Sequence, residues 1–153
     1  MIQRIQTIYL ALAVIVSSTL TYVNIADYVT KTGIYVLKMR GVFNSLDWAE
    51  AAILENNIYT LLITLSIIIP LYTIFCFKKR KLQMKLTLAS IVINLFTFGW
   101  TFAITNFARE FIDFKTHYSI FLIFPLISAI SLILAYININ KDEKLIKSLN
   151  RIR

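Results

Sequence analysis

The chain has 153 residues and a formal net charge of +8, and 58% of its residues are hydrophobic whereas 16% are charged. Soluble domains average about 25% charged residues and 45–50% apolar ones, so this composition excludes an ordinary soluble domain. The length suits one domain, and three Gly and two Pro leave little room for flexible linkers.

Four stretches of 22 to 25 residues contain no Asp, Glu, Lys or Arg. A hydrocarbon core needs about 20 helical residues, and a charge at the centre of a span is costly. We therefore predict an all-α membrane protein, a bundle of four transmembrane helices that forms a single domain over 1–153. The expected parts are spans at about 5–25, 57–77, 86–107 and 118–138, an outer loop 26–56, a cytoplasmic loop 78–85 and a cytoplasmic tail 139–153.

The first span also has the basic start of a signal peptide, at Arg4. Its apolar run is longer than the 7–15 residues typical of such peptides, and the following "VSSTLTYVN" has no small-x-small cleavage site. An uncleaved anchor is favoured, and both alternatives leave residue 24 onward outside.

The outer loop carries strand and helix signals. A turn at 31–33 separates two β-prone runs. In the second run Tyr35, Leu37 and Met39 alternate with Val36, Lys38 and Arg40, which predicts a small β-hairpin lying on the membrane surface. Asn44 and Ser45 are good N-cap residues, so a short helix is expected to follow. The second outer connection, 109–119, has balanced charges and is expected to be a solvated turn.

The basic residues predict the orientation. Eleven Lys and Arg fall on the side of the N-terminus, in the loop 78–85 and in the tail, against five on the other side. The positive-inside rule therefore places both termini in the cytoplasm. No zinc-finger spacing or RNP-like aromatic motif accompanies the charge, so nucleic acid is not an expected partner.

The third span carries a stripe of polar residues within one narrow arc of the helix. Such residues serve as helix-packing or partner contacts, or alternatively line a polar pathway. The stripe consists of Thr87, Ser90, Asn94, Thr97, Thr101 and Thr105.

Small residues and prolines mark other helix faces. Pro70 and Pro125 each fall inside a predicted span, where a kink is possible. Small residues spaced four apart favour close helix packing, and they occur at Ala13, Ser17 and Thr21 and at Ser131 and Ala135.

Nothing in the sequence makes a case for catalysis. No span contains an ionisable residue of the kind that marks an ion path, and there is no Ser/His/Asp set, CxxC or phosphate-binding loop. Cys76 and His117 are each the only residue of their type. We predict no enzyme activity, no cofactor and no metal site.

The tail "KDEKLIKSLNRIR" has its apolar residues on one helical face and basic residues around it. This pattern predicts a short amphipathic helix parallel to the membrane, and an acidic partner is the alternative ligand for its charges. Candidate contacts with anionic lipid headgroups, here and in the loop 78–85, are Lys78, Lys79, Arg80, Lys81, Lys144, Lys147, Arg151 and Arg153.

Three segments resemble a domain-of-unknown-function family of small four-pass bacterial inner-membrane proteins: "MIQRIQTIYLALA", "FKKRKLQMKL" and "KDEKLIKSLNRIR". Members open with MIQRIQ and end in a DEKL-type basic tail, although Asn150 stands where an acidic residue would be expected. The resemblance implies the bacterial cytoplasmic membrane and supplies no activity. The expected role is an accessory or scaffold subunit that acts through a membrane-protein partner or as a homo-oligomer. The alternative is a transporter or channel subunit that uses the polar stripe.

Overall fold

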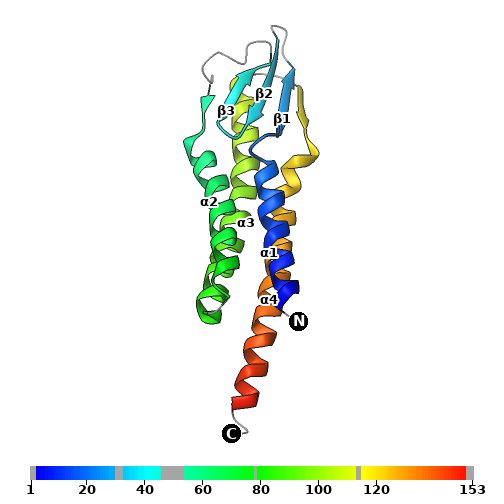
Figure 1. Cartoon of the computed structure of the whole chain (residues 1–153). Coiled ribbons are helices and arrows are strands. Elements are labelled where there is room, and N and C mark those ends of the chain that lie inside the picture. The colour runs from blue at the N-terminus through cyan, green and yellow to red at the C-terminus, as the bar shows by residue number, and fades with distance from the viewer. Residues whose placement is uncertain (1–2, 30–32, 46–53, 78, 113–114, 151–153) are drawn as a thin grey trace.

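The computed structural model describes residues 3–29, 33–45, 54–77, 79–112 and 115–150. It is mostly helical, with four helices and a small antiparallel sheet at one end (Figure 1). The helices are α1 (Gln3–Thr19), α2 (Asn57–Phe75), α3 (Arg80–Ile112) and α4 (Phe124–Asn150). A 3-10 turn, η1 (Ile120–Ile123), leads into α4.

The helices form a bundle in which each packs against two neighbours, in the order α1, α2, α3, α4 and back to α1. Three of them are long and apolar enough to cross a membrane, over Asn57–Phe75, Arg80–Phe107 and Ile120–Ile146. The apolar part of α1, Ile5–Thr19, is shorter.

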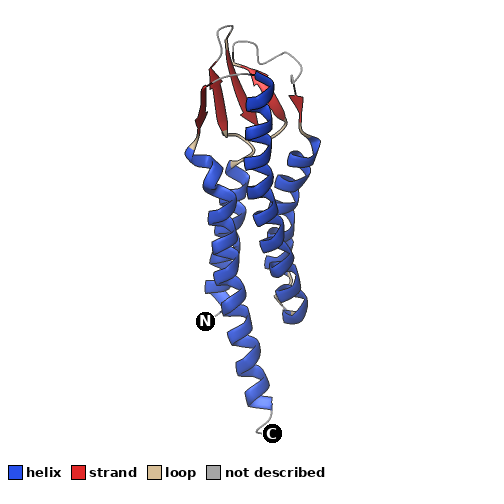
Figure 2. Ribbon diagram, turned by 180° about the vertical axis from the view of Figure 1, so that it is seen from behind, coloured by secondary structure: helices blue, strands red, loops and turns tan. Residues whose placement is uncertain are grey.

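The sheet has five strands in the order β4-β3-β2-β1-β5, every neighbouring pair antiparallel. The predicted hairpin is confirmed by the pairing of β1 (Ala26–Val29) with β2 (Ile34–Lys38). It lies inside a larger sheet that also contains β3 (Gly41–Asn44), β4 (Leu54–Glu55) and β5 (Lys115–Tyr118). The sheet covers one end of the bundle (Figure 2).

The turn between β2 and β3 has only two residues, Met39 and Arg40, because Lys38 pairs with Gly41. Gly41 has a φ of 147°, which a side chain would make unfavourable. This turn reaches toward the helices: the Met39 carbonyl accepts a hydrogen bond from the Thr60 hydroxyl (3.0 Å), and the Arg40 carbonyl accepts one from the Asn56 amide (2.9 Å).

The main apolar core lies between the sheet and the adjacent ends of the helices. Tyr28, Leu37 and Tyr59 are fully buried in it, and Tyr35 and Met39 pack against it. The expected inward residues thus meet the core, but the predicted alternation is only partly confirmed, because Val36 on the opposite face is also buried (3% exposed). At the start of α2, the Asn56 side chain accepts hydrogen bonds from the Tyr59 amide (3.1 Å) and the Trp100 indole (3.3 Å), which joins α2 to α3.

Several expected boundaries were wrong. The connection 109–119 is not a solvated turn, because α3 continues to Ile112 and β5 pairs with β1. Asn44 ends strand β3 instead of capping a helix, and the short helix expected after it falls largely on 46–53, outside the described residues. The loop 78–85 is mostly helix, since α3 begins at Arg80.

The tail also differs from the expectation. Residues 139–150 continue α4 without a break instead of forming a separate helix. No Gly or Pro occurs after Pro125, so nothing stops the helix from continuing. Pro125 lies in the first turn of α4, where proline is tolerated, and only Pro70 is inside a helix.

Candidate functional site

The polar stripe of α3 lies inside the bundle. All six of its side chains are at most 1% exposed. The structure therefore brings together every residue of this predicted set, on the face of α3 that meets the other helices.

Each residue of the stripe is hydrogen-bonded to its own helix. The side chains donate to the backbone carbonyl four residues earlier, over distances of 2.6 to 2.9 Å. This pattern is common for Ser and Thr in apolar helices, and it leaves these donors satisfied without any ligand.

The stripe also contacts polar groups of the other helices. In the buried interior, the Ser17 hydroxyl of α1 lies 3.0 Å from that of Ser128 in α4 and 3.5 Å from the Asn94 side-chain oxygen. Nearer the sheet, the Thr101 hydroxyl lies 3.2 Å from the Tyr59 hydroxyl of α2. Ser17, Asn94 and Ser128 thus form a polar contact among three helices.

A second buried polar group lies at the end of the bundle away from the sheet. The Gln6 amide of α1 donates to the Asp142 carboxylate of α4, and Arg80 of α3 lies 4.0 Å from the same oxygen. Gln6 and Asp142 are only 5% and 6% exposed. Gln83 donates to the Thr73 carbonyl (3.4 Å), which joins α2 and α3 at the same end.

Sequence reasoning did not single out Asp142 as a buried residue. A signal was present, because the buried face of α4 runs through Ser128, Leu132, Ala135 and Ile139 at alternating spacings of four and three. The next position in that series is 142. The tail is therefore packed against the bundle at least as far as Asp142.

The candidate lipid contacts are only partly described. Lys79, Lys81 and Lys144 are exposed, whereas Arg80 is partly buried beside Asp142. Lys78, Arg151 and Arg153 lie outside the described residues, as does the side chain of Lys147.

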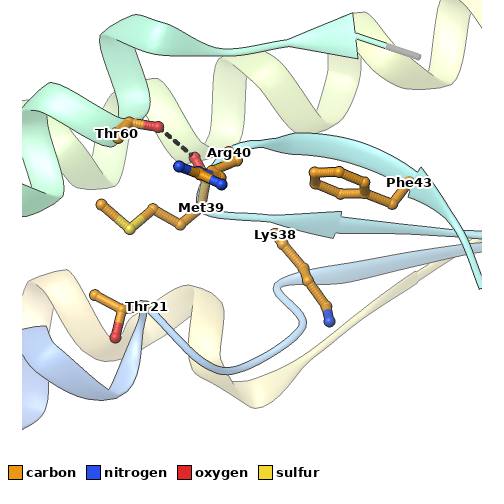
Figure 3. A pocket seen from close by; sticks show the side chains of 6 residues that line it. All are labelled: Thr21, Lys38, Met39, Arg40, Phe43 and Thr60. Atoms are coloured by element: carbon orange, nitrogen blue, oxygen red, sulfur yellow. Dashed lines mark hydrogen bonds between the residues drawn. The ribbon is translucent and has the colours of Figure 1, made fainter. Parts of the chain in front are cut away.

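Two cavities lie near opposite ends of the bundle. One, of about 560 Å³, is near the Gln6 end and is lined by residues including Ile8, Ile74 and Gln83. The other, of about 480 Å³, lies beneath the turn between β2 and β3 and is lined by Thr21, Lys38, Met39, Arg40, Phe43 and Thr60 (Figure 3).

The part of the chain that the structure describes contains no group of three or more His, Cys, Asp or Glu that could hold a metal ion. His117 lies on β5, directly opposite Asp27 of β1. Cys76 is half-buried and ends α2.

The helices, the polar interior and the sheet together describe a helical bundle whose apolar helices are compatible with a membrane protein. No curated protein sequence matches the chain. A family model described as a domain of unknown function, DUF4293, matches residues 2–152, and the chain therefore belongs to this family.

Proposed function

We propose that this chain is a four-span protein of the bacterial cytoplasmic membrane, with both termini in the cytoplasm. In this proposal it is not an enzyme. It acts as an accessory or scaffold subunit that presents the sheet on one side of the membrane and the end of α4 on the other, to a membrane-protein partner or to another copy of itself.

The exposed surface of the helices supports the membrane placement. Large apolar side chains point outward along the whole bundle, among them Ile15 (63% exposed), Phe75 (70%) and Val92 (60%). Such an extended apolar surface is unfavourable in water and suits lipid. The 17 residues of α1 cover roughly 25 Å, somewhat less than a typical hydrocarbon core, and the turn after Thr19 would then lie close to the interface.

The fold is compatible with the predicted orientation. α1 begins, and α4 ends, at the end of the bundle away from the sheet (Figure 1). The exposed lysines Lys79, Lys81 and Lys144 lie at that end too, where anionic headgroups of the cytoplasmic leaflet would attract them.

The observation that carries the scaffold proposal is the burial of the α3 stripe inside the bundle. Its side chains are buried and bonded to their own backbone, so they join helices without lining a polar route. The transporter alternative depended on this stripe as a pathway and thereby loses its main support.

The protruding end of α4 is the part best placed for a cytoplasmic partner. The C-terminal part of α4 extends past the ends of the other helices (Figure 2). Lys144 and Leu145 are exposed there, so this segment offers both charge and apolar surface.

A cross-linking experiment in intact membranes, followed by purification in mild detergent, tests the proposal. The tagged full chain should recover one partner, or a second copy, in a constant ratio. A chain that ends at Glu143 retains Asp142 and should lose a partner bound through the tail. Recovery of the isolated monomer in every detergent would contradict the scaffold role.

Reporter fusions at the C-terminus test the orientation separately. A fused green fluorescent protein should fluoresce, and fused alkaline phosphatase should be inactive. Active phosphatase at this position would reverse the proposed topology.

A further inference from the structure

The cavity near Gln6 combines apolar walls with buried amide groups. It lies at the end of the bundle away from the sheet, where three helices contribute to its wall. Its lining includes Gln6 and Ile8 of α1, Ile74 and Phe75 of α2, and Gln83 of α3. The volume of about 560 Å³ is within the usual range of small-ligand sites, which are mostly apolar and carry a few polar groups that fix the ligand.

The two amide side chains of the cavity wall retain donors for a ligand. Gln6 is 5% exposed and Gln83 is 4% exposed. The Gln6 amide donates to Asp142, and the Gln83 amide donates to the Thr73 carbonyl. An amide NH2 group carries two hydrogens, and each of these bonds uses one. A ligand with acceptor oxygens therefore satisfies donors that are costly to bury without a partner.

The described lining of the cavity carries no charged side chain. The nearby Asp142 carboxylate accepts from Gln6 and lies 4.0 Å from Arg80, and neither of these charged residues is part of the described lining. A charge without a partner is costly in apolar surroundings. The cavity therefore favours an uncharged ligand over a phospholipid headgroup, whose phosphate finds no cation among the described lining residues.

The apolar wall of the cavity continues into the outer surface of the bundle. Ile8 is 62% exposed and Phe75 is 70% exposed, and both line the cavity. In the proposed membrane placement this surface faces lipid, so a ligand enters from the bilayer. The ring of Phe75 also favours packing against another flat ring.

We propose that this cavity binds the ring of an isoprenoid quinone dissolved in the membrane. The ring carbonyls accept hydrogen bonds from Gln6 and Gln83, the ring packs against Phe75, and the isoprenoid chain follows Ile8 into the lipid. A quinone is uncharged, flat and lipid-soluble, and its strong polar groups are acceptors, as the amide donors and apolar walls require. This binding rests on the proposed membrane placement and is independent of the scaffold role.

Quenching of tryptophan fluorescence tests this binding in the full-length protein. Phe75→Trp places a reporter in the cavity wall, and Leu88→Trp places a control reporter at an exposed position of α3 outside the described lining. The unsubstituted chain, with its two tryptophans, gives the background signal. Each protein is placed in nanodiscs and titrated with decylubiquinone, whose fully substituted ring does not add to the Cys76 thiol. Quenching should saturate at position 75 and rise linearly at position 88.

Amide variants identify the groups that bind the carbonyls. Gln83→Met keeps the length of the side chain and removes its donor, so the dissociation constant should rise about fivefold, as for the loss of one hydrogen bond. Asn138→Leu is the control, because this amide of α4 donates to its own helix and is not part of the described lining. It should leave the dissociation constant unchanged. An unchanged constant for Gln83→Met would overturn the assigned role of this amide.

A filling variant separates loss of the cavity from loss of the fold. Ile8→Phe with Ile74→Phe adds two rings to the wall and retains both amides. It should abolish the saturable quenching while the protein keeps its thermal transition. The matched pair Ile15→Phe with Ile68→Phe makes the same change at exposed positions outside the described lining, and it should retain the quenching.

Two results would overturn the quinone proposal and leave the membrane placement intact. The first is linear quenching at both reporter positions, which means that the quinone has no site. The second is displacement of the quinone by an equal concentration of decylbenzene, which lacks carbonyls, because the cavity would then accept any apolar chain. A chain that fails to enter nanodiscs would overturn the membrane placement and this binding together.

Discussion

Ser17 of α1 and Ser128 of α4 lie 3.0 Å apart, hydroxyl to hydroxyl, in the buried interior of the bundle. Ser128 also approaches the Ala13 carbonyl of α1 at 3.3 Å. Small side chains allow this close approach of two helices, and their hydroxyls satisfy one another in an apolar surrounding. The α1–α4 contact should therefore be sensitive to an increase in side-chain volume at Ser17.

Ser17→Leu should therefore destabilise the bundle far more than Ser18→Leu. Ser17 is fully buried, whereas Ser18 is only half-buried and bonds to its own helix. Overpacking of a tight interface costs about 1–3 kcal/mol, and loss of the hydroxyl contact adds about 0.6 kcal/mol. Unfolding in detergent, followed by circular dichroism, measures both variants. Equal stability of the two would contradict the close α1–α4 contact.

The Gln6–Asp142 pair should stabilise the attachment of the tail. Asp142→Ala leaves the buried Gln6 amide without its acceptor, which costs about 1–3 kcal/mol. Asp142→Asn preserves an acceptor and removes only the charge facing Arg80, with an effect of at most about 1 kcal/mol because Arg80 is partly exposed.

A double-mutant cycle with Gln6→Ala and Asp142→Ala measures this coupling directly. We expect an interaction free energy of at least about 0.5 kcal/mol, as for residues in contact. The neighbouring Glu143→Ala, combined with Gln6→Ala, provides the control and should be additive. Additivity for Asp142 as well would mean that the tail is not held at this point.

The helices could be predicted from the sequence because lipid imposes a length and a composition that are visible in single runs of residues. The α3 stripe could also be predicted from a single run of residues, because Asn94 and the other polar residues of the stripe repeat at helical spacing. Whether the stripe lines a route or a contact depends on what faces it, and that is set by α1 and α4, which are distant in the chain.

Strand β5 could not be predicted because its partner is about 90 residues away and it has only four residues. A short segment such as Lys115–Tyr118 becomes a strand only when an edge such as that of β1 lies beside it. The course of the tail was ambiguous for a different reason: a helix lying on the membrane and a helix continuing from a bundle have the same period.

Tyr28 makes the stability of the sheet end sensitive to alkaline pH. Burial raises the pKa of its hydroxyl from 10.0 to about 12, and an interaction with the Thr105 side chain partly offsets this. In the unfolded chain the hydroxyl ionises near its ordinary pKa, so the stability contributed by the neutral group is present below pH 10 and is lost as pH rises toward 12.

Tyr28→Phe should therefore reduce the fall in melting temperature between pH 9 and pH 12, although it lowers stability at neutral pH by removing the hydrogen bond to the Thr105 carbonyl (3.3 Å). Thermal scans across this pH range measure the effect. Tyr22→Phe, at an exposed position, should leave the pH dependence as in the wild type. Parallel pH profiles for Tyr28→Phe and the wild type would contradict the assignment.

The register of β5 against β1 predicts a disulfide. Asp27 and His117 are directly opposite each other, and side chains at such positions are about 5 Å apart at Cβ, close enough for two cysteines to join with little adjustment. Asp27→Cys with His117→Cys, in a Cys76→Ala background, should form an intramolecular disulfide when the sheet faces the oxidising side of the membrane.

Asp27→Cys with Tyr118→Cys is the matched control, because adjacent strand residues point to opposite faces of a sheet. Its cysteines should remain separate, as a maleimide gel-shift assay with and without reductant would measure. A disulfide in the control but not in the test pair would indicate that the true register of β5 against β1 differs by one residue. A third outcome is that both pairs keep free thiols in cells, while copper phenanthroline in detergent oxidises only the 27–117 pair. This outcome would support the strand pairing but indicate that the sheet lies on the cytoplasmic side. The same pair of cysteines therefore tests the strand pairing and the orientation with separate outcomes.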